Sequence, residues 1–241
     1  MEEYVDIHCH ILPGIDDGSS NMEETLQMIE VAYNDGIRTI ITTPHYHEGR
    51  FKNKVAEYEA ALNDVKRQVK DKYPDLNLYL GCEIYYSHEC IDLLDKQELP
   101  TMAGSRYILL EFSPGKEYSY IKKSLQKCLF AGYLPILAHV ERYKSIEQDI
   151  DLVEDLINMG AYIQVNANSI IGKSGGRSKK FTRNLLQRDM VHFIGTDSHN
   201  MNSRSPSIKK CVNHINKRYG TTYLEKWLVD NPRKILNKEY I

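Results

Sequence analysis

Short apolar runs alternate along the chain with longer segments in which apolar residues recur every three or four positions. The runs are rich in β-branched and aromatic residues and have the length of buried strands. They span residues 5–10, 39–44, 78–84, 107–112, 134–140, 162–166 and 192–196. The segments with helical spacing span residues 22–34, 53–72, 118–131, 146–159, 178–187, 207–219 and 223–229. The pattern therefore predicts seven strands, most of them separated by helices.

This alternation is typical of parallel strands joined by crossover helices. Gly36, Gly132 and Gly160 each follow a predicted helix and precede a predicted strand, as glycines at helix C-termini do. An open doubly wound sheet and a closed barrel are both compatible with this order. Two features favour the barrel. No G-x-G-x-x-G sequence follows the first strand, and polar residues stand at the carboxyl ends of nearly all the strands. We therefore predict an α/β fold with a (β/α) barrel.

The composition is that of an ordinary globular protein. The chain has 241 residues, 41% of them hydrophobic and 27% charged, with a net charge of −2. It has no repeat or evident linker, so we expect one domain over residues 1–241. Neither half is strongly basic, which argues against avid nucleic-acid binding. No run of about 18 apolar residues predicts a membrane span, and no basic segment followed by an apolar stretch predicts a secretory signal.

The cysteines indicate a reducing compartment and exclude one class of phosphatase. They are widely spaced and form no C-x-x-C pair: Cys9, Cys82, Cys90, Cys128 and Cys211. This usage predicts reduced thiols in a cytoplasmic protein. No cysteine is followed six positions later by arginine, so the C-x5-R signature of cysteine-dependent phosphatases is absent.

Ionisable residues gather where the predicted strands end. Side chains alternate across a strand, so Asp6, His8 and His10 share one face of the first strand. The carboxyl ends of barrel strands form one rim, so residues at the other strand ends should meet them there. The candidate metal ligands are His8, His10, Asp17, His45, Glu83, Glu111, His139, Asp197 and His199.

Each of these residues alone has a simpler explanation, such as a hydrogen-bonded histidine, a helix cap or a solvated charge. Together they predict a metal centre, because clustered carboxylates are costly to desolvate without cations. Nine ligands exceed the needs of one ion, so we expect two or three divalent ions, with Glu83 bridging. The nitrogen and oxygen donors are compatible with manganese, iron or zinc. Such ions supply hydroxide near neutral pH and bind the oxygens of a phosphoryl group.

Two arginines stand close to predicted ligands. Arg142 follows His139 by three residues, and Arg204 follows His199 by five. Arginine suits bidentate contact with phosphate. The alternative for Arg142 is a surface salt bridge with Glu141 or Glu147, and we favour the phosphate role. For Arg204 the position alone leaves both possibilities open.

Other suggestive residues are assigned structural roles. The remaining histidines (His47, His88, His192 and His214) are expected away from the rim or at the start of a strand. Residues 172–180, GKSGGRSKK, lack the spacing of a phosphate-binding P-loop. We expect this segment to be a mobile basic loop near the active site.

With these residues in view, the chain resembles the PHP (polymerase and histidinol phosphatase) superfamily. It is most similar to the manganese-dependent protein-tyrosine phosphatases of Gram-positive capsule and exopolysaccharide synthesis, the CpsB/YwqE type. The motifs that carry the resemblance are DIHCHILPGIDDGS, GIRTIITTPHYHEGRF, GCEIY, YILLEF, PILAHVERY and FIGTDSHN. They occur in this order from Val5 to about Asn202. The sequence departs from many relatives at Val140, where they have proline, and in TDSH, where SDAH is commoner.

The resemblance implies a distorted (β/α)7 barrel with a trinuclear cluster. One ion would be held by His8, His10, Glu83 and Asp197, a second by Glu83, Glu111 and His139, and a third by Asp17, His45 and His199. Asp6 is then expected to orient a histidine from outside the ligand set, and Asp16 to shape the turn. Arg142 and Arg204 match arginines that grip the substrate phosphate, while His199 and Asp17 complete the set expected to act in catalysis.

The implied activity is hydrolysis of protein phosphotyrosine by direct attack of a metal-bridging hydroxide, without a phospho-enzyme. The implied substrate is the tyrosine-rich tail of a partner tyrosine kinase that controls polysaccharide synthesis. His199 or a metal-bound water would protonate the leaving tyrosinate. The alternatives are a PHP phosphatase of a small phosphomonoester, such as histidinol phosphate, and a non-catalytic relative that retains the fold.

Overall fold

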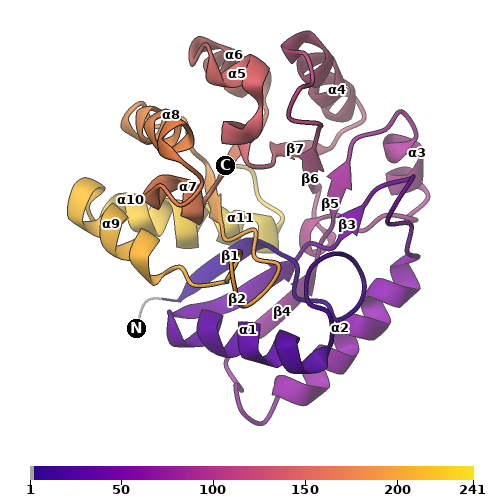
Figure 1. The fold of residues 1–241 in the computed structure, drawn as a ribbon. Coiled ribbons are helices and arrows are strands. Elements are labelled where there is room, and N and C mark those ends of the chain that lie inside the picture. Colours follow the sequence, from indigo (N-terminus) through magenta and orange to yellow (C-terminus); the bar gives the residue numbers. More distant parts are fainter. Residues whose placement is uncertain (1–2) are drawn as a thin grey trace.

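The computed structural model describes residues 3–241, in which strands and helices alternate along the chain (Figure 1). Every strand pairing is parallel. The strands are β1 (Tyr4–Cys9), β2 (Ile37–Thr42), β3 (His45–Tyr46), β4 (Asn77–Leu80), β5 (Glu83–Tyr85), β6 (Tyr107–Glu111), β7 (Leu134–Leu137), β8 (Tyr162–Asn166) and β9 (Phe193–Gly195).

The strands form a closed ring of seven paths. One sheet has the order β1-β2-β4 and the other β3-β5-β6-β7-β8-β9. Strand β3 continues β2 after two residues, and β5 continues β4 in the same way. The ring closes between β9 and β1, where Cys9 bridges to Ser198 and the His10 amide donates to the Ser198 carbonyl at 2.9 Å. The predicted seven-stranded barrel is confirmed.

Helices lie outside the strands (Figure 1). They are α1 (Met22–Asn34), α2 (Val55–Val69), α3 (Cys90–Asp95), α4 (Tyr118–Phe130), α5 (Lys144–Glu147), α6 (Asp151–Met159), α7 (Ala167–Ile171), α8 (Gly176–Gln187), α9 (Lys209–Tyr219), α10 (Thr221–Glu225) and α11 (Asn231–Asn237). A π-helical turn, η3 (Lys226–Asp230), joins the last two. Within residues 3–241, no helix combines the length and the apolar content needed to cross a membrane.

Several predicted boundaries are wrong. The helix predicted over 146–159 is two helices, α5 and α6, and α3, α7 and α11 were not predicted. The strand predicted over 134–140 ends at Leu137, because His139 has a φ of 34° and leaves the extended conformation. By contrast, α1 matches its prediction: Asn21 caps it by accepting a hydrogen bond from the Glu24 amide at 3.0 Å.

Most strands are buried on both faces, in two hydrophobic clusters, whereas β4 exposes Asn77 and Tyr79 on one face. Alternate residues of β6 to β9, including Tyr107, Leu109 and Phe193, belong to one cluster. The intervening residues, such as Ile108 and Ile194, belong to the other, which includes residues of the surrounding helices. The first face continues beyond Leu109 to Glu111, since side chains two apart point the same way. The barrel interior is therefore apolar towards the amino ends of the strands and polar at their carboxyl ends.

Candidate metal centre

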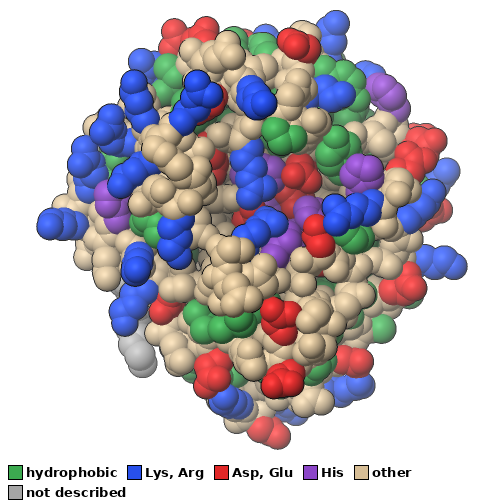
Figure 2. Space-filling model, viewed as in Figure 1, with side chains coloured by type: hydrophobic (Ala, Val, Ile, Leu, Met, Phe, Trp, Pro, Cys, Tyr) green, Lys and Arg blue, Asp and Glu red, His purple; other side chains and the backbone are tan. Residues whose placement is uncertain are grey.

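The nine predicted ligands converge at the carboxyl ends of the strands. Figure 2 shows acidic, basic and histidine side chains gathered in a hollow at the centre of the molecule. Among residues 3–241, ligand atoms close enough to share an ion occur in four overlapping sets: His8–His10–Glu83–Asp197, His10–His45–His199, Asp16–Asp17–His45 and His45–Glu83–Glu111. His139 joins them through Glu83, whose Oε1 lies 2.8 Å from its Nε2.

The deepest set consists of His8, His10, Glu83 and Asp197, all fully or almost fully buried. The Nε2 atoms of the two histidines lie 3.2 Å apart. Asp197 Oδ1 lies 3.4 Å from His8 Nε2 and 3.6 Å from His10 Nε2. Two ligands that share an ion at about 2.1 Å are roughly 3.0–3.4 Å apart in octahedral or tetrahedral geometry. The spacing of these four side chains therefore fits a common cation.

Glu83 lies between the sets and has one oxygen that three imidazoles approach. Its Oε2 atom is 3.1 Å from His8 Nε2, 3.2 Å from His10 Nε2 and 3.1 Å from His45 Nδ1. This buried oxygen nevertheless makes no hydrogen bond to any residue that the structure describes. Burial raises the pKa of Glu83, but the His8 and His45 charges outweigh it and lower the pKa well below its ordinary value. An ionised, buried carboxylate oxygen without a donor fits a metal ligand.

A second set surrounds Glu111. His139 Nε2 lies 3.4 Å from Glu111 Oε1, and His45 Nδ1 lies 3.9 Å from Glu111 Oε2. His45, Glu83 and Glu111 are close enough to share one ion, and His139 borders the same space through its contacts with both carboxylates. The structure thus brings together the three residues that the family resemblance implies for the second ion, and adds His45 to their surroundings.

A third group, formed by Asp17, His45 and His199, lies nearest to solvent. His45 Nε2 is 3.4 Å from Asp17 Oδ1, and His199 Nε2 is 3.6 Å from the same oxygen. The two imidazole Nε2 atoms are themselves 3.4 Å apart. The Asp17 side chain is 38% exposed, whereas that of His199 is 2% exposed. An ion at this position would therefore be the one most accessible to a substrate.

Burial and neighbouring charges set the protonation of the cluster. Burial lowers the pKa of His139 to about 4, and burial together with the His10 charge lowers the pKa of His199 to about 2. Both imidazoles are therefore neutral near pH 7, which is the form that binds metals. Burial, together with the charge of Glu83, raises the pKa of Glu111 to about 8. A cation beside Glu111 would displace its proton and offset the free-energy cost of burying the charged carboxylate.

The residue that orients a histidine is Asp16, not Asp6. Asp16 Oδ2 lies 2.8 Å from His10 Nδ1 and accepts a hydrogen bond from the His45 amide at 2.8 Å. Its other oxygen accepts from the Gly18 amide at 2.9 Å. Asp16 therefore shapes the turn, as predicted, and also fixes the His10 ring with Nε2 facing the cluster.

The expectation that Asp6 orients a histidine ring is wrong. Asp6 Oδ1 accepts from the backbone amides of His8 at 3.2 Å and Thr196 at 3.0 Å. Its other oxygen accepts from the Thr196 hydroxyl. The carboxylate therefore joins β1 to the residue that follows β9, where the barrel closes, and within residues 3–241 it makes no hydrogen bond to an imidazole.

Two polar residues of β8 were not singled out from the sequence. Gln164 Oε1 accepts from the His139 amide at 2.7 Å and lies 3.2 Å from His8 Nδ1. Asn166 Nδ2 donates to Asp197 Oδ2 at 2.8 Å. Both point inward from a buried strand, and that is the one signal that could have identified them. They hold three of the candidate ligands in place.

Gly195 provides the space that this packing needs. A Cβ atom at Gly195 would lie 2.7 Å from the Cβ of His8 and 3.1 Å from Gln164 Nε2. Contacts this short between Cβ atoms require the backbone to shift. Glycine at this position therefore allows β9 to approach β1 closely enough for Asp197 to reach His8.

The two predicted arginines meet at one carboxylate. Arg142 Nη2 donates to Asp197 Oδ2, and Arg204 Nη2 donates to Asp197 Oδ1 at 2.6 Å. Their side chains are 38% and 35% exposed, so each guanidinium also faces solvent. The salt-bridge alternative for Arg142 fails: Glu147 pairs with Arg177 at 3.6 Å, and buried Glu141 accepts from a backbone amide.

The cluster opens into a cleft of about 350 Å³. It is lined by Asp17, His45, His47, Arg50, Phe51, Tyr85, Glu111, Arg142 and Arg204. The expectation that His47 lies away from the rim is therefore wrong.

The segment 172–180 does not line the cleft, and its second half forms the start of α8. Arg50, whose Nη2 is 3.2 Å from Asp17 Oδ2, is a third arginine here.

Known proteins share both the sequence and the fold. A family model described as "Capsular polysaccharide synthesis, CpsB/CapC" matches residues 4–237. The tyrosine-protein phosphatase CpsB of Streptococcus pneumoniae is 37% identical over 245 residues, covering 98% of this chain and 100% of the relative.

Solved structures extend this likeness. A chain from the crystal structures of YwqE from Bacillus subtilis and CpsB from Streptococcus pneumoniae, described as metal-dependent tyrosine phosphatases, matches with a TM-score of 0.91 and 30% identity. The match covers 98% of this chain and 96% of that one. A phosphotriesterase homology protein from Escherichia coli matches with a TM-score of 0.65 and 13% identity, covering 97% and 98%. The last match supports the barrel fold alone.

Proposed function

Because the chain belongs to the CpsB/CapC family of capsular polysaccharide synthesis, we propose that it is a metal-dependent tyrosine-protein phosphatase. The observation that carries the proposal is the convergence of nine side chains with nitrogen and oxygen donors, among them Glu83, whose buried Oε2 makes no hydrogen bond within residues 3–241. Two exposed guanidinium groups stand beside them, on Arg142 and Arg204.

The residues fit two or three divalent cations. His8, His10, Glu83 and Asp197 would hold one, Glu83, Glu111 and His139 a second, and Asp17, His45 and His199 a third. Bound there, the ions would lower the pKa of a water and neutralise the charge of a phosphoryl group. The donor set suits manganese, and it is also compatible with iron or zinc.

The arginines would bind and orient the substrate phosphate. Each donates to Asp197 through one Nη2 atom, so the remaining N–H groups of each fork are free to reach phosphate oxygens. The neutral state of His199 favours a ligand role over the role of proton donor, because its pKa of about 2, set first by burial, leaves no proton to give near neutral pH.

The cleft favours a protein substrate over a small phosphomonoester. Its outer wall includes Arg50, 63% exposed, and Asp17, 38% exposed, so the phosphate site opens to solvent. An open site admits a tyrosine carried on a protein surface. We propose a phosphotyrosine protein as substrate, in particular the tyrosine-rich tail of a kinase that regulates polysaccharide synthesis. We also propose a cytoplasmic location, which five buried free cysteines support.

A turnover assay with controlled metal content tests the function. Wild-type protein is freed of metal by a chelator and reconstituted with Mn²⁺, Fe²⁺ or Zn²⁺. It is then assayed on a phosphotyrosine peptide, the matched phosphoserine peptide and histidinol phosphate. We expect turnover of the phosphotyrosine peptide that disappears on chelation, returns with Mn²⁺ and is insensitive to thiol alkylation. Activity that survives complete metal removal, or that is highest on histidinol phosphate, would overturn the proposal.

A further inference from the structure

The cleft has a second layer of side chains above the candidate ligands. His45 of β3 lies opposite Glu83 of β5 in the register of the sheet. Because side chains two residues apart share a face, His47 and Tyr85 follow them on the same side, one step closer to solvent. Their rings lie side by side, with centroids 4.3 Å apart. The polar floor is thus continued by an aromatic pair.

A tight hairpin adds a third ring to this layer. The His47 amide donates to the Phe51 carbonyl at 2.8 Å, and the Phe51 amide donates back to the His47 carbonyl at 2.8 Å. This pairing turns residues 47–51 back over the cluster. The Phe51 ring lies nearly parallel to the His45 ring, with centroids 5.7 Å apart and an interplanar angle of 10°. Arg50, in the same hairpin, covers Phe51 at 4.5 Å from the ring centroid.

These three rings remain partly exposed inside the cleft. His47, Phe51 and Tyr85 all line it, and none of them is fully buried. The arginines come from other parts of the barrel, since Arg142 follows β7 and Arg204 follows β9. The cleft therefore has a charged floor, with Arg142 and Arg204 on the side of β7 and β9. On the side of β3 and β5 it has an aromatic wall, formed by His47, Phe51 and Tyr85.

We propose that the aromatic wall contacts the phenyl ring of phosphotyrosine and selects aryl phosphates over alkyl phosphates. The inference rests on the proposed function. Two residues of a strand rise about 6.6 Å, so a phosphate on the floor places a ring attached through one oxygen beside the wall. A phosphoserine side chain has no ring to reach it. Favourable pairs of aromatic rings are each expected to strengthen binding about 3- to 10-fold.

Phosphonates that cannot be hydrolysed test the wall separately from catalysis. Inhibition constants for phenylphosphonate and methylphosphonate are measured with metal-loaded wild-type protein, Phe51→Leu and Tyr85→Leu. We expect each variant to bind phenylphosphonate about 3- to 10-fold more weakly and methylphosphonate within twofold of wild type. Tyr85→Phe, which keeps the ring, should recover most of the loss. For the phosphotyrosine peptide, KM should rise with little change in kcat.

A matched control and a metal measurement separate this role from a structural one. Tyr79→Leu makes the same chemical change at a partly exposed tyrosine outside the cleft, and it should leave both inhibition constants unchanged. Bound metal per chain is measured for every variant. Equal weakening of both phosphonates, or loss of metal, would assign Phe51 and Tyr85 to supporting the cluster and overturn the inference.

Failure of the inference is distinguishable from failure of the proposed function. If wild-type protein hydrolyses the phosphotyrosine peptide while the variants bind phenylphosphonate as tightly as wild type, the aromatic wall alone is overturned. If wild-type protein with bound metal does not hydrolyse the phosphotyrosine peptide, the proposed function falls first.

Discussion

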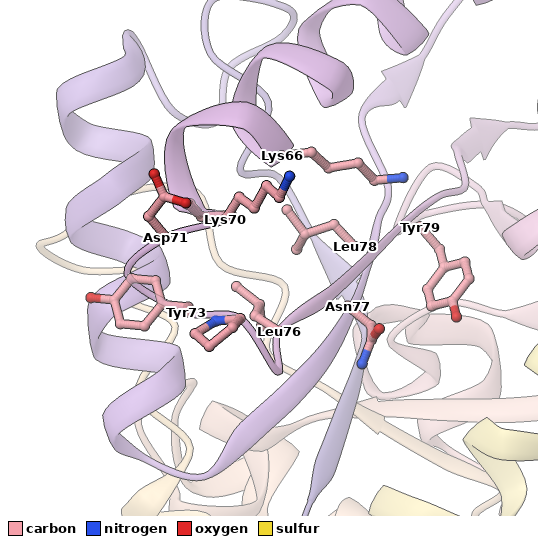
Figure 3. Close-up of a pocket in the computed structure, with 10 residues that line it drawn as sticks. Lys66, Lys70, Asp71, Tyr73, Leu76, Asn77, Leu78 and Tyr79 are labelled. Atoms are coloured by element: carbon pink, nitrogen blue, oxygen red, sulfur yellow. The ribbon is translucent and has the colours of Figure 1, made fainter.

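Two hollows of the molecule differ in size and in chemistry. The larger, about 680 Å³, lies between α2 and β4, where Lys66 and Lys70 border Leu78 (Figure 3). The cleft over the candidate metal centre has about half that volume, 350 Å³. Yet within residues 3–241 the sets of side chains able to share a cation all belong to the cleft region. The chemistry of the lining, and not its volume, identifies the site.

The strand path formed by β4 and β5 shows why the two hollows differ, because one end borders the large pocket and the other enters the metal centre. Asn77 begins β4 beside the large pocket, while Glu83, six residues further on, begins β5 in the metal centre. In barrels of this type the carboxyl ends of the strands carry function, and the amino ends mainly support stability. Substitutions at the two ends should therefore have very different consequences.

The largest effect is expected for Glu83→Gln. Glutamine keeps the shape of the side chain but removes the charge that lies between His8, His10 and His45. We expect kcat/KM to fall by about 10³-fold or more, on the scale seen when a catalytic group is removed, with loss of bound metal. Turnover and metal per chain are measured together, with circular dichroism to check the fold. Activity within tenfold of wild type would contradict the central position of Glu83.

A smaller effect is expected for Asp16→Asn. The amide oxygen can still accept a hydrogen bond from His10, but the negative charge that accompanies it is lost. Changes to partners that orient metal ligands typically cost about 10- to 100-fold in affinity or activity. Metal affinity, measured by competition with a chelator, should fall by this factor. Asp64→Asn, an exposed change on α2, is the control, and equal affinities in the two variants would refute the role.

His192 extends the comparison to a partly buried histidine outside the cleft. Burial, followed by the charge of Lys226, lowers its pKa to about 4, and its Nδ1 accepts from the Ile163 amide at 3.1 Å. The unfolded chain protonates His192 near its ordinary pKa of about 6.5. The stability that neutral His192 contributes is therefore present above pH 6.5 and is lost as the pH falls from about 6.5 to 4.

We expect His192→Asn to make the free energy of unfolding less dependent on pH across this window, by at most about 3 kcal/mol. Urea denaturation of both proteins at pH 7 and pH 4.5 measures the difference. If the free energy of unfolding depended on pH equally in the two proteins, the lowered pKa of His192 would be contradicted.

The smallest effect is expected for Lys70→Ala in the large pocket. Lys70 is exposed at the end of α2. Surface changes of this kind usually alter stability by less than about 0.5 kcal/mol, and we expect kcat/KM to stay within twofold of wild type. Thermal unfolding and the peptide assay check both. A tenfold loss of activity would mean that the large pocket takes part in function and would remove the contrast between the two hollows.

The sequence predicted the barrel and the convergence of ligands for related reasons. Short apolar runs located all seven strand paths, because every strand buries at least one face in the core. Once the strands are parallel, residues at their carboxyl ends must lie together, which placed Glu111 of β6 near His45 of β3. Both inferences depend only on local pattern and strand direction.

The predictions that were wrong or missing concern contacts between different segments of the chain. Alternation places Asp6 and His8 on one face, but it does not reveal that the Thr196 amide would occupy the Asp6 carboxylate. The contact between Gln164 and His139 likewise follows from the register of two strands. His47 was placed away from the rim because the hairpin with Phe51 has no clear sequence signal. Such partners are set by three-dimensional packing.

The closure of the barrel by β9 against β1 has a consequence for how the protein is made. Cys9 and Ser198, which face each other at that seam, are 189 positions apart in the chain. On the ribosome, His8 and His10 emerge long before Asp197 and His199, which follow them only after a long stretch of chain has been made. A nascent chain that stops before β9 carries most of the donors but has no closed ring around them. Metal capture by the deepest set is therefore tied to the synthesis of β9 and the residues that follow it.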